Sequence, residues 1–168
     1  MAMNEERKWE MKKYALTDET MEIGMTTLHR IKALVAFADV EIGDTGGWVE
    51  KESNLDQNGD ACVYGDARVS GNAWVSGENH YLVIGPIGSR NDTITFTRNK
   101  KGGIFASVGC FFGTLAEFRT KVSKTHGDNI HAQAYLLAAK LAELRIDTTP
   151  ISDTQEEATE RCEKGSAE

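Results

Sequence analysis

The sequence predicts a β-rich α+β fold in which a short parallel β-helix is followed by a β-hairpin and a helical hairpin. Three observations support this prediction: hexapeptide repeats that begin at Gly59, an alternating apolar and polar segment within 81–98, and two amphipathic segments within 114–145. A period of six residues with an aliphatic residue at a fixed place is typical of a parallel β-helix. Period two indicates strands, and a period of 3.6 indicates helices.

The clearest pattern is the run of repeats. They begin at Gly59, Gly65 and Gly71, align without gaps as Gly-(Asp/Asn)-Ala-x-Val-x, and fade into a fourth copy at Gly77. The valine is expected to fill the interior of a solenoid, the alanine to fit where a corner leaves little room, and the glycine to form the turn. An antiparallel meander with chance alternation is the alternative, which three consecutive copies disfavour.

Three hexads build only about one triangular coil, and a solenoid this short cannot bury its own ends. The segments on either side must therefore act as caps or degenerate coils. Before the repeats, residues 14–34 are expected to form a β-hairpin. Leu28, Ile31 and Leu34 fit a helical period almost as well, but the threonine and isoleucine content and Gly24 favour strands.

Strands and then helices are expected after the repeats. Residues 81–84, 93–98 and 104–110 have the composition of strands, with Ile94 and Phe96 on the buried side. Thr114 and Glu117 form a capping box that predicts the start of a helix.

Asp128 is expected to cap a second helix over 129–145. The inward-facing residues are predicted to be Leu115, Phe118 and Val122 in the first helix and Ile130, Ala134, Leu137 and Leu141 in the second.

These patterns divide the chain into five segments. They are a flexible leader (1–13), an N-terminal β cap with a degenerate coil (14–58), the hexapeptide-repeat solenoid (59–80), a β-hairpin with a two-helix module (81–145) and a disordered acidic tail (146–168). A solenoid with so few coils exposes sheet edges and flat apolar faces, so a homo-oligomer is expected.

The charge is concentrated at one end of the chain. The net charge is −7, and residues 147–168 contain seven acidic and two basic residues, which leaves about −2 for the rest. A nearly neutral body lacks the basic surface of a protein that binds duplex nucleic acid. It can still hold a local basic pocket for a small anion.

Several protein classes are disfavoured by composition. No stretch approaches the roughly 20 apolar residues of a membrane helix, and the charged N-terminal residues lack the apolar core of a secretory signal. Cys62, Cys110 and Cys162 are odd in number and lack metal-ligand spacing, which disfavours a disulfide framework and a metal site. The sequence therefore predicts a cytoplasmic protein without a membrane partner, a metal or a cofactor.

Short motifs occur in a fixed order between positions 13 and 145. They are Lys13-Tyr-Ala-Leu-Thr, Thr27-Leu-His-Arg-Ile-Lys-Ala-Leu, Gly46-Gly-Trp-Val, the Gly-Asp-Ala-x-Val hexads, Gly85-Pro-Ile-Gly-Ser-Arg, Gly109-Cys-Phe-Phe-Gly and Thr125-His-Gly-Asp. In this order they resemble a family of phage and prophage proteins with hexapeptide repeats. The resemblance implies a phage or mobile-element origin and a left-handed β-helical core, and it implies no catalytic scheme.

The segment from Gly85 to Arg90, Gly-Pro-Ile-Gly-Ser-Arg, is the main candidate binding site. Its glycines allow close backbone approach, successive N–H groups could form a nest for an anion, and Arg90 offers a two-pronged donor for phosphate. The residues predicted to bind a small anion are Gly85, Gly88, Ser89, Arg90, Thr95, Thr97, Arg98 and Lys101. A tight turn with a solvated arginine is the alternative, and it is the commoner role of such Gly/Pro segments.

Other polar residues have simpler explanations. His126 suits a helix C-terminus, which accounts for it without a metal. His80 could act as the general base of a hexapeptide-repeat acyltransferase, but one coil gives little wall for an acyl-carrier cofactor. Cys110 lies among Val108, Phe111 and Phe112, so an inert buried thiol is expected. No catalytic set is assembled by spacing alone.

Three functions are compatible with these sequence patterns. The first is a non-catalytic phage accessory protein that counters host defence by binding and sequestering a nucleotide-type signalling molecule. The second is a protein-protein inhibitor or structural module that binds a host defence protein. The third is a small acyltransferase-like enzyme, which the missing coils disfavour.

Overall fold

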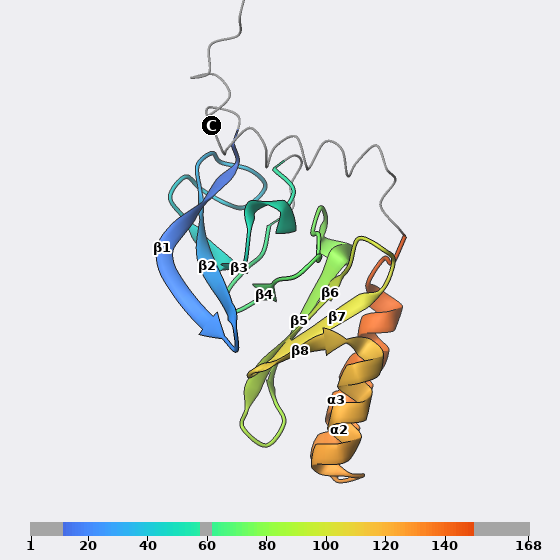
Figure 1. The fold of residues 1–168 in the computed structure, drawn as a ribbon. Coiled ribbons are helices and arrows are strands. Elements are labelled where there is room, and N and C mark those ends of the chain that lie inside the picture. Colours follow the sequence, from blue (N-terminus) through green and yellow to red (C-terminus); the bar gives the residue numbers. More distant parts are fainter. Residues whose placement is uncertain (1–11, 58–61, 150–168) are drawn as a thin grey trace, which may run out of the picture.

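The structure is a computed structural model that describes residues 12–57 and 62–149. Its strands form two open four-stranded sheets, in the orders β1-β2-β3-β4 and β5-β6-β7-β8 (Figure 1). The fold is therefore α+β, as predicted. The expected leader over 1–11, the start of the first repeat over 58–61 and the acidic tail over 150–168 lie outside the described residues.

The elements follow one another along the chain in a simple order. The first sheet contains β1 (Tyr14–Ile23), β2 (Thr26–Ala33), β3 (Thr45–Val49) and β4 (Arg68–Val69). The second contains β5 (Tyr81–Ile87), β6 (Asp92–Arg98), β7 (Ile104–Val108) and β8 (Phe111–Thr114). The helices are α2 (Leu115–His126) and α3 (Ile130–Arg145), with short 3₁₀ helices η1 (Glu52–Asn54) and η2 (Glu78–His80).

The expected N-terminal hairpin is confirmed. β1 and β2 pair antiparallel across a turn at Gly24, whose φ of +60° favours glycine. Leu28, Ile31 and Ala33 of β2 are buried, and β3 pairs antiparallel with β2 on its other side. The β-branched and threonine content of this segment therefore outweighs the helical spacing of its apolar residues.

The prediction of a left-handed parallel β-helix is wrong. The described part of the repeats contributes one two-residue strand, β4, which pairs parallel with β3, and an isolated parallel bridge between Leu55 and Val75. Because β1, β2 and β3 are antiparallel, the repeats extend an open sheet and do not close into stacked coils. Three repeats supply too little chain for stacking, and stacking is what buries the faces of a solenoid.

Individual positions of the repeats nevertheless behave as expected. The fully buried positions are Val63, Ala67, Val69, Ala73 and Val75. Gly65 and Gly71 have φ of +57° and +63°, in the left-handed region that favours glycine. The six-residue period thus specifies which residues are buried and where the chain turns, but it does not specify how the sheet closes.

A pair of glycines in β3 lets the repeats lie against it. A Cβ atom at Gly46 would lie 2.6 Å from the carbonyl oxygen of Val63, and one at Gly47 would lie 2.6 Å from Val63 Cγ1. At this short distance the backbones of β3 and the repeats form hydrogen bonds. The Gly47 N–H donates to Val63 O at 2.7 Å, and the Trp48 N–H donates to Ala67 O at 2.8 Å. A side chain at position 47 would force these two segments apart.

Asn54 fastens the end of the repeats to η1. Its side chain is fully buried, and its Nδ2 donates to the carbonyl oxygens of Gly71 and Ala73 at 3.1 and 2.8 Å. Its Oδ1 accepts from the Lys51 N–H at 3.0 Å. One amide therefore satisfies three backbone groups that the short strands leave unpaired.

The second sheet is an antiparallel meander, and both helices lie on one of its faces (Figure 1). Ile94 and Phe96 of β6 are fully buried in the core between the sheet and the helices, as predicted. The Phe118 ring contacts Phe96 and Tyr135 edge-on, with centroids 5.8 and 5.7 Å apart. This core fixes α3 against the loop that connects β5 to β6.

The N-terminal cap of α2 is the predicted one, and the N-terminal cap of α3 is one residue later than predicted. At α2 the Glu117 N–H donates to Thr114 Oγ1 at 3.3 Å and the Thr114 N–H donates to Glu117 Oε2 at 2.7 Å, which confirms the capping box. At α3 the cap is Asn129 and not Asp128, because Asn129 Oδ1 accepts from the His131 N–H at 3.0 Å.

The predicted inward face of α2 is confirmed, and that of α3 is wrong. Leu115, Phe118 and Val122 are buried. In α3 the buried residues are Ala132, Tyr135, Ala138, Ala139 and Ala142. Ile130, Leu137 and Leu141, which were predicted to face inward, are 70%, 71% and 43% exposed. Small alanines allow α3 to approach the sheet closely, so the larger leucines turn outward.

Among the helices that the structure describes, none is long and apolar enough to cross a membrane.

The contact between β3 and the repeats can be tested with Gly47→Ala. The new methyl group overlaps Val63 and Ala67, so we expect the free energy of unfolding to fall by about 1–3 kcal/mol, as for other overpacked sites. The measurement is urea unfolding followed by circular dichroism. Gly24→Asn is the matched control, because position 24 has open space and asparagine tolerates positive φ. Equal stability of Gly47→Ala and the natural sequence would contradict this account.

Candidate functional site

The predicted anion loop connects β5 to β6. Gly85 lies within β5, and Gly88, Ser89 and Arg90 form the turn after it. Ser89 and Arg90 are exposed. Arg90 makes no ion pair or hydrogen bond with any residue of the described chain, so its guanidinium is available to a ligand.

The glycines of this loop have structural roles. A Cβ atom at Gly85 would lie 2.8 Å from Thr93 Oγ1, and one at Gly88 would overlap the hydroxyl of Tyr135. Gly88 also has φ of +79°, which favours glycine. The loop therefore turns tightly and lets Tyr135 of α3 reach its backbone.

Tyr135 is a residue of this site that no sequence pattern indicated. Its side chain is only 8% exposed, yet its hydroxyl makes no hydrogen bond within the described residues and is not sealed from solvent. Burial raises the pKa of Tyr135, the charge of Asp92 raises it further, and the charge of Arg90 lowers it. The hydroxyl thus stays protonated, and it can donate a hydrogen bond beside the positive charge of Arg90.

One histidine lies beside Tyr135, and a second histidine lies beside the first. The His126 ring at the end of α2 is 5.8 Å from the Tyr135 ring and 5.8 Å from the His131 ring of α3, measured between centroids. The capping role expected for His126 is compatible with its place at the helix end, where the Gly127 N–H donates to Ser123 O at 3.0 Å. Sequence spacing did not indicate that the His126 ring would lie between the rings of His131 and Tyr135.

The other predicted site residues lie elsewhere. Thr95 and Thr97 are buried on the face of β6 that is turned away from the helices, where Thr95 Oγ1 accepts from the Arg68 N–H at 3.0 Å. Lys101 is exposed in the turn between β6 and β7, at the opposite end of β6 from Arg90. The structure therefore brings Gly88, Ser89 and Arg90 together and separates them from Thr95, Thr97, Arg98 and Lys101.

Arg98 belongs to a buried cluster that joins the two sheets. It is 5% exposed, its guanidinium carbon lies 4.8 Å from the centroid of the Trp74 ring, and its Nε donates to Trp74 O at 3.2 Å. Further hydrogen bonds run to Ser76 Oγ at 3.3 Å and to Thr149 O at 3.4 Å. Burial lowers the pKa of Arg98, and the charge of Asp147 opposes this. These contacts leave Arg98 without a free face for a ligand.

His80 completes this cluster. It is 8% exposed, stacks on Trp74 with centroids 6.5 Å apart, and accepts the Ser76 N–H at its Nδ1 at 3.0 Å. Burial lowers the pKa of His80, the charge of Arg98 lowers it further, and Asp147 opposes them. The cluster therefore holds a neutral imidazole and serves to join segments.

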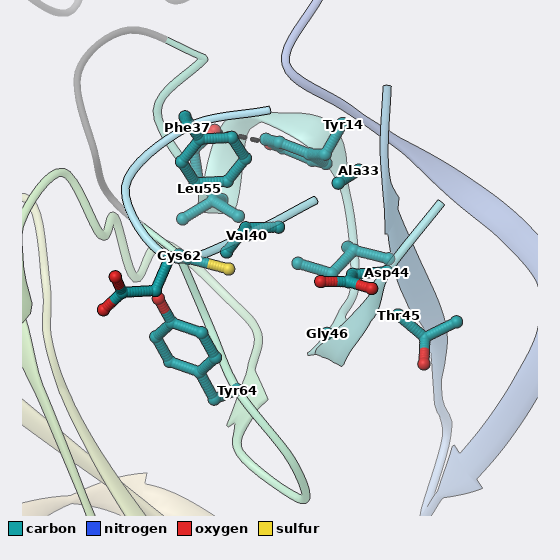
Figure 2. Close-up of a pocket in the computed structure, with 12 residues that line it drawn as sticks. Tyr14, Ala33, Phe37, Val40, Asp44, Thr45, Gly46, Leu55, Cys62 and Tyr64 are labelled. Carbon is teal, nitrogen blue, oxygen red and sulfur yellow. Dashed lines mark hydrogen bonds between the residues drawn. The ribbon is translucent and has the colours of Figure 1, made fainter. Parts of the chain in front are cut away.

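A separate hollow of about 220 Å³ lies on the first sheet. Figure 2 shows Tyr14, Phe37 and Leu55 around it and the Cys62 sulfur pointing into it. Asp39 and Asp44 also line it, and its described lining residues include no lysine or arginine. Its charge is therefore unsuited to an anion.

The cysteines differ from expectation. Cys110 is exposed and Cys62 is buried, so the prediction that Cys110 is buried is wrong. Cys110 follows Gly109, whose φ of +56° marks the tight turn between β7 and β8, and this turn places the thiol outside. Burial raises the pKa of Cys62, which keeps its thiol protonated and a poor nucleophile. No group of three metal-ligating side chains occurs within 12–57 and 62–149.

Comparison of the sequence with protein-family models and with curated proteins gives no match.

The buried cluster predicts a specific pH dependence of stability. Because the pKa of folded His80 lies below its ordinary value of 6.5, the unfolded chain binds the proton more tightly than the folded chain. The contribution is complete above about pH 6.5 and is lost as pH falls towards the folded pKa, by up to about 1.4 kcal/mol per pH unit. The free energy of unfolding is measured with urea at values between about pH 7.5 and about pH 5, the range in which histidine side chains titrate. Its change per pH unit is the slope to be compared between variants.

The matched variants are His80→Gln and His131→Gln. We expect the slope of unfolding free energy against pH to be lost in His80→Gln and to be retained in His131→Gln. An unchanged slope in His80→Gln would show that other groups carry the pH dependence.

Proposed function

We propose that this protein binds a small anionic ligand of the nucleotide type at the loop between β5 and β6. The site consists of Gly88, Ser89 and Arg90 with Tyr135 and His126. The observation that carries the proposal is the pairing of an unpaired arginine with an unbonded hydroxyl of a nearly buried tyrosine, both against a glycine turn.

The donors in this site suit a phosphate group. Arginine can give two parallel N–H bonds to phosphate oxygens, and such charge-assisted bonds are roughly twice as strong as neutral ones. The Tyr135 hydroxyl adds a third donor that needs no large ordering cost, because its ring is already fixed between Phe118 and His126. Ser89 is exposed at the same turn and adds a hydroxyl.

Asp92 shapes the selectivity of the site. Its carboxylate is close enough to raise the pKa of Tyr135, so it opposes a compact, highly charged anion at that hydroxyl. A carboxylate accepts hydrogen bonds from amino and hydroxyl groups. The combination of Arg90 and Asp92 therefore favours a ligand that carries both an anionic group and hydrogen-bond donors, as a nucleotide does.

In biological terms we propose a non-catalytic phage accessory protein that counters host defence by sequestering a nucleotide-type signal in the host cytoplasm. This setting rests on the resemblance to phage and prophage proteins described above. The geometry supports binding over turnover, because the described polar groups of the loop form no paired nucleophile and base.

Of the two other candidate functions, the structure offers support for one and disfavours the other. A protein-protein inhibitor or interaction module is supported by the exposed leucines of α3. An acyltransferase-like enzyme is disfavoured, because His80 is packed against Trp74 and accepts a backbone N–H, so it is not directed at an open site.

The proposal is tested by binding measurements on three variants. The probes are inorganic phosphate, adenosine 5′-monophosphate and guanosine 5′-monophosphate, together with mass spectrometry of any small molecule released by denaturing the purified protein. We expect Arg90→Ala to weaken binding about tenfold to a hundredfold, because a hydrogen bond to a charged group contributes about 1.5–3 kcal/mol. Tyr135→Phe keeps the ring and removes the hydroxyl, so it should weaken binding by about fivefold to tenfold.

Lys101→Ala is the matched control, because it removes a positive charge at the far end of β6. It should leave the dissociation constant unchanged. A bound ligand stabilises the protein by about 2.7 kcal/mol at a hundredfold excess over its dissociation constant, so a thermal shift detects the same effect. The proposal is wrong if no probe or released molecule binds, or if Lys101→Ala and Arg90→Ala weaken binding equally.

A further inference from the structure

Helix α3 has two apolar faces. One contains the buried residues Ala132, Tyr135, Ala138, Ala139 and Ala142, which pack on the second sheet and α2. The other contains Ile130, Ala134, Leu137, Leu141 and Leu144, which we call the leucine stripe. Ile130, Leu137 and Leu144 are 70%, 71% and 75% exposed, and Leu141 is 43% exposed. Burying one face of α3 therefore leaves a second apolar face in water.

The spacing of the leucine stripe is that of a helix-pairing seam. Its members follow one another at intervals of four, three, four and three residues. This is the alternation of a and d positions in a heptad, which keeps one line of apolar side chains on a helix facing a partner helix. Scattered exposed apolar residues are normal on a protein surface, but a continuous apolar line along a whole helix marks an interaction surface.

We propose that a second copy of this chain packs antiparallel on the leucine stripe and forms a symmetric homodimer. In this arrangement a twofold axis passes near Leu137, so Ile130 of one protomer lies near Leu144 of its partner. The small Ala134 then lies near the partner's Leu141, and the large residue fills the space that the small one leaves. A twofold-symmetric interface uses the same surface patch on both subunits, so that patch must be complementary to itself.

The charges beside the leucine stripe select the antiparallel orientation. The flanking positions hold Gln133 and Lys140 on one side and His131 and Arg145 on the other. A parallel pair would place Lys140 opposite Arg145, and like charges at such flanking positions are unfavourable. An antiparallel pair places Lys140 opposite the neutral Gln133, which can accept a hydrogen bond from it. It also places Arg145 opposite His131, and an imidazole is uncharged over a wider pH range than a lysine ammonium group, so this contact is less repulsive than one between lysine and arginine.

The size of the surface predicts a dimer that depends on concentration. A helix of 16 residues is about 24 Å long, and the leucine stripe offers five residues on it, fewer than the about 20–30 residues a side of a standard specific interface. The dimer should therefore dissociate on dilution. It does not depend on the proposed ligand, because Arg90 and Tyr135 lie on other surfaces.

Sedimentation equilibrium over a range of concentrations tests the dimer. We expect the mass to rise from 18.5 kDa towards twice that value with concentration. Leu137→Lys and Leu144→Lys should hold the mass at that of a monomer, and unchanged circular dichroism shows that they fold. Met25→Lys is the matched control, because Met25 is fully exposed in the β1–β2 turn and should leave the dimer intact.

Orientation is tested with a spin label at Asp128→Cys, an exposed position just before α3 that is outside the leucine stripe, in a background that carries Cys110→Ser and Cys162→Ser. In the antiparallel dimer the two labels lie nine residues on either side of the axis, about 27 Å apart along the helices. A parallel dimer would place them about 10 Å apart. A natural sequence that stays monomeric at every concentration, a dimer that survives Leu137→Lys, or the short label distance would each overturn the proposal.

Discussion

The close approach of β3 to the repeats organises the N-terminal half of the protein. Gly46 and Gly47 have no side chains, so the backbone carbonyls of Val63 and Ala67 come within hydrogen-bonding distance of β3. This contact holds the buried valines of the repeats against the first sheet. Further along, the repeats are held by the Asn54 side chain, which donates to Gly71 O and Ala73 O, and by β6, where the Trp74 N–H donates to Arg98 O. Backbone proximity, more than side-chain size, therefore organises the N-terminal half.

Arg98 continues this connection into the C-terminal half. A buried guanidinium is unfavourable unless its N–H groups are hydrogen-bonded, and here they bind Trp74 O, Ser76 Oγ and Thr149 O. The same side chain thus joins the repeats, β6 and the segment that follows α3. This structural role removes Arg98 from the candidate ligand site and leaves Arg90 as the accessible arginine beside Tyr135. Two arginines that are eight positions apart in the sequence therefore have opposite roles, because one is enclosed and the other is at a turn.

Helix α3 links the proposed ligand site to the proposed dimer. Its alanine face lets Tyr135 approach Gly88, and a bulkier residue in place of those alanines would hold the helix further from the sheet. The cost of this close packing is that the leucines of α3 face outward. One face of α3 therefore positions Tyr135 of the proposed ligand site, and the other carries the leucine stripe of the proposed dimer. The two proposals use different side chains, so each can fail without the other.

Local patterns in the sequence were enough to predict the N-terminal hairpin, the capping box at Thr114, the buried face of α2 and the buried valines of the repeats. These features depend on neighbours within a few residues, so periodicity and capping chemistry predict them. The folded structure was needed to show that the sheets stay open, that Arg98 is enclosed, that Tyr135 meets the loop at Gly88 and that the His126 ring lies beside Tyr135. It also decided which apolar face of α3 is buried, because periodicity shows that a face is apolar but not what covers it. Contacts between distant segments carry this information, and no spacing within one segment contains it.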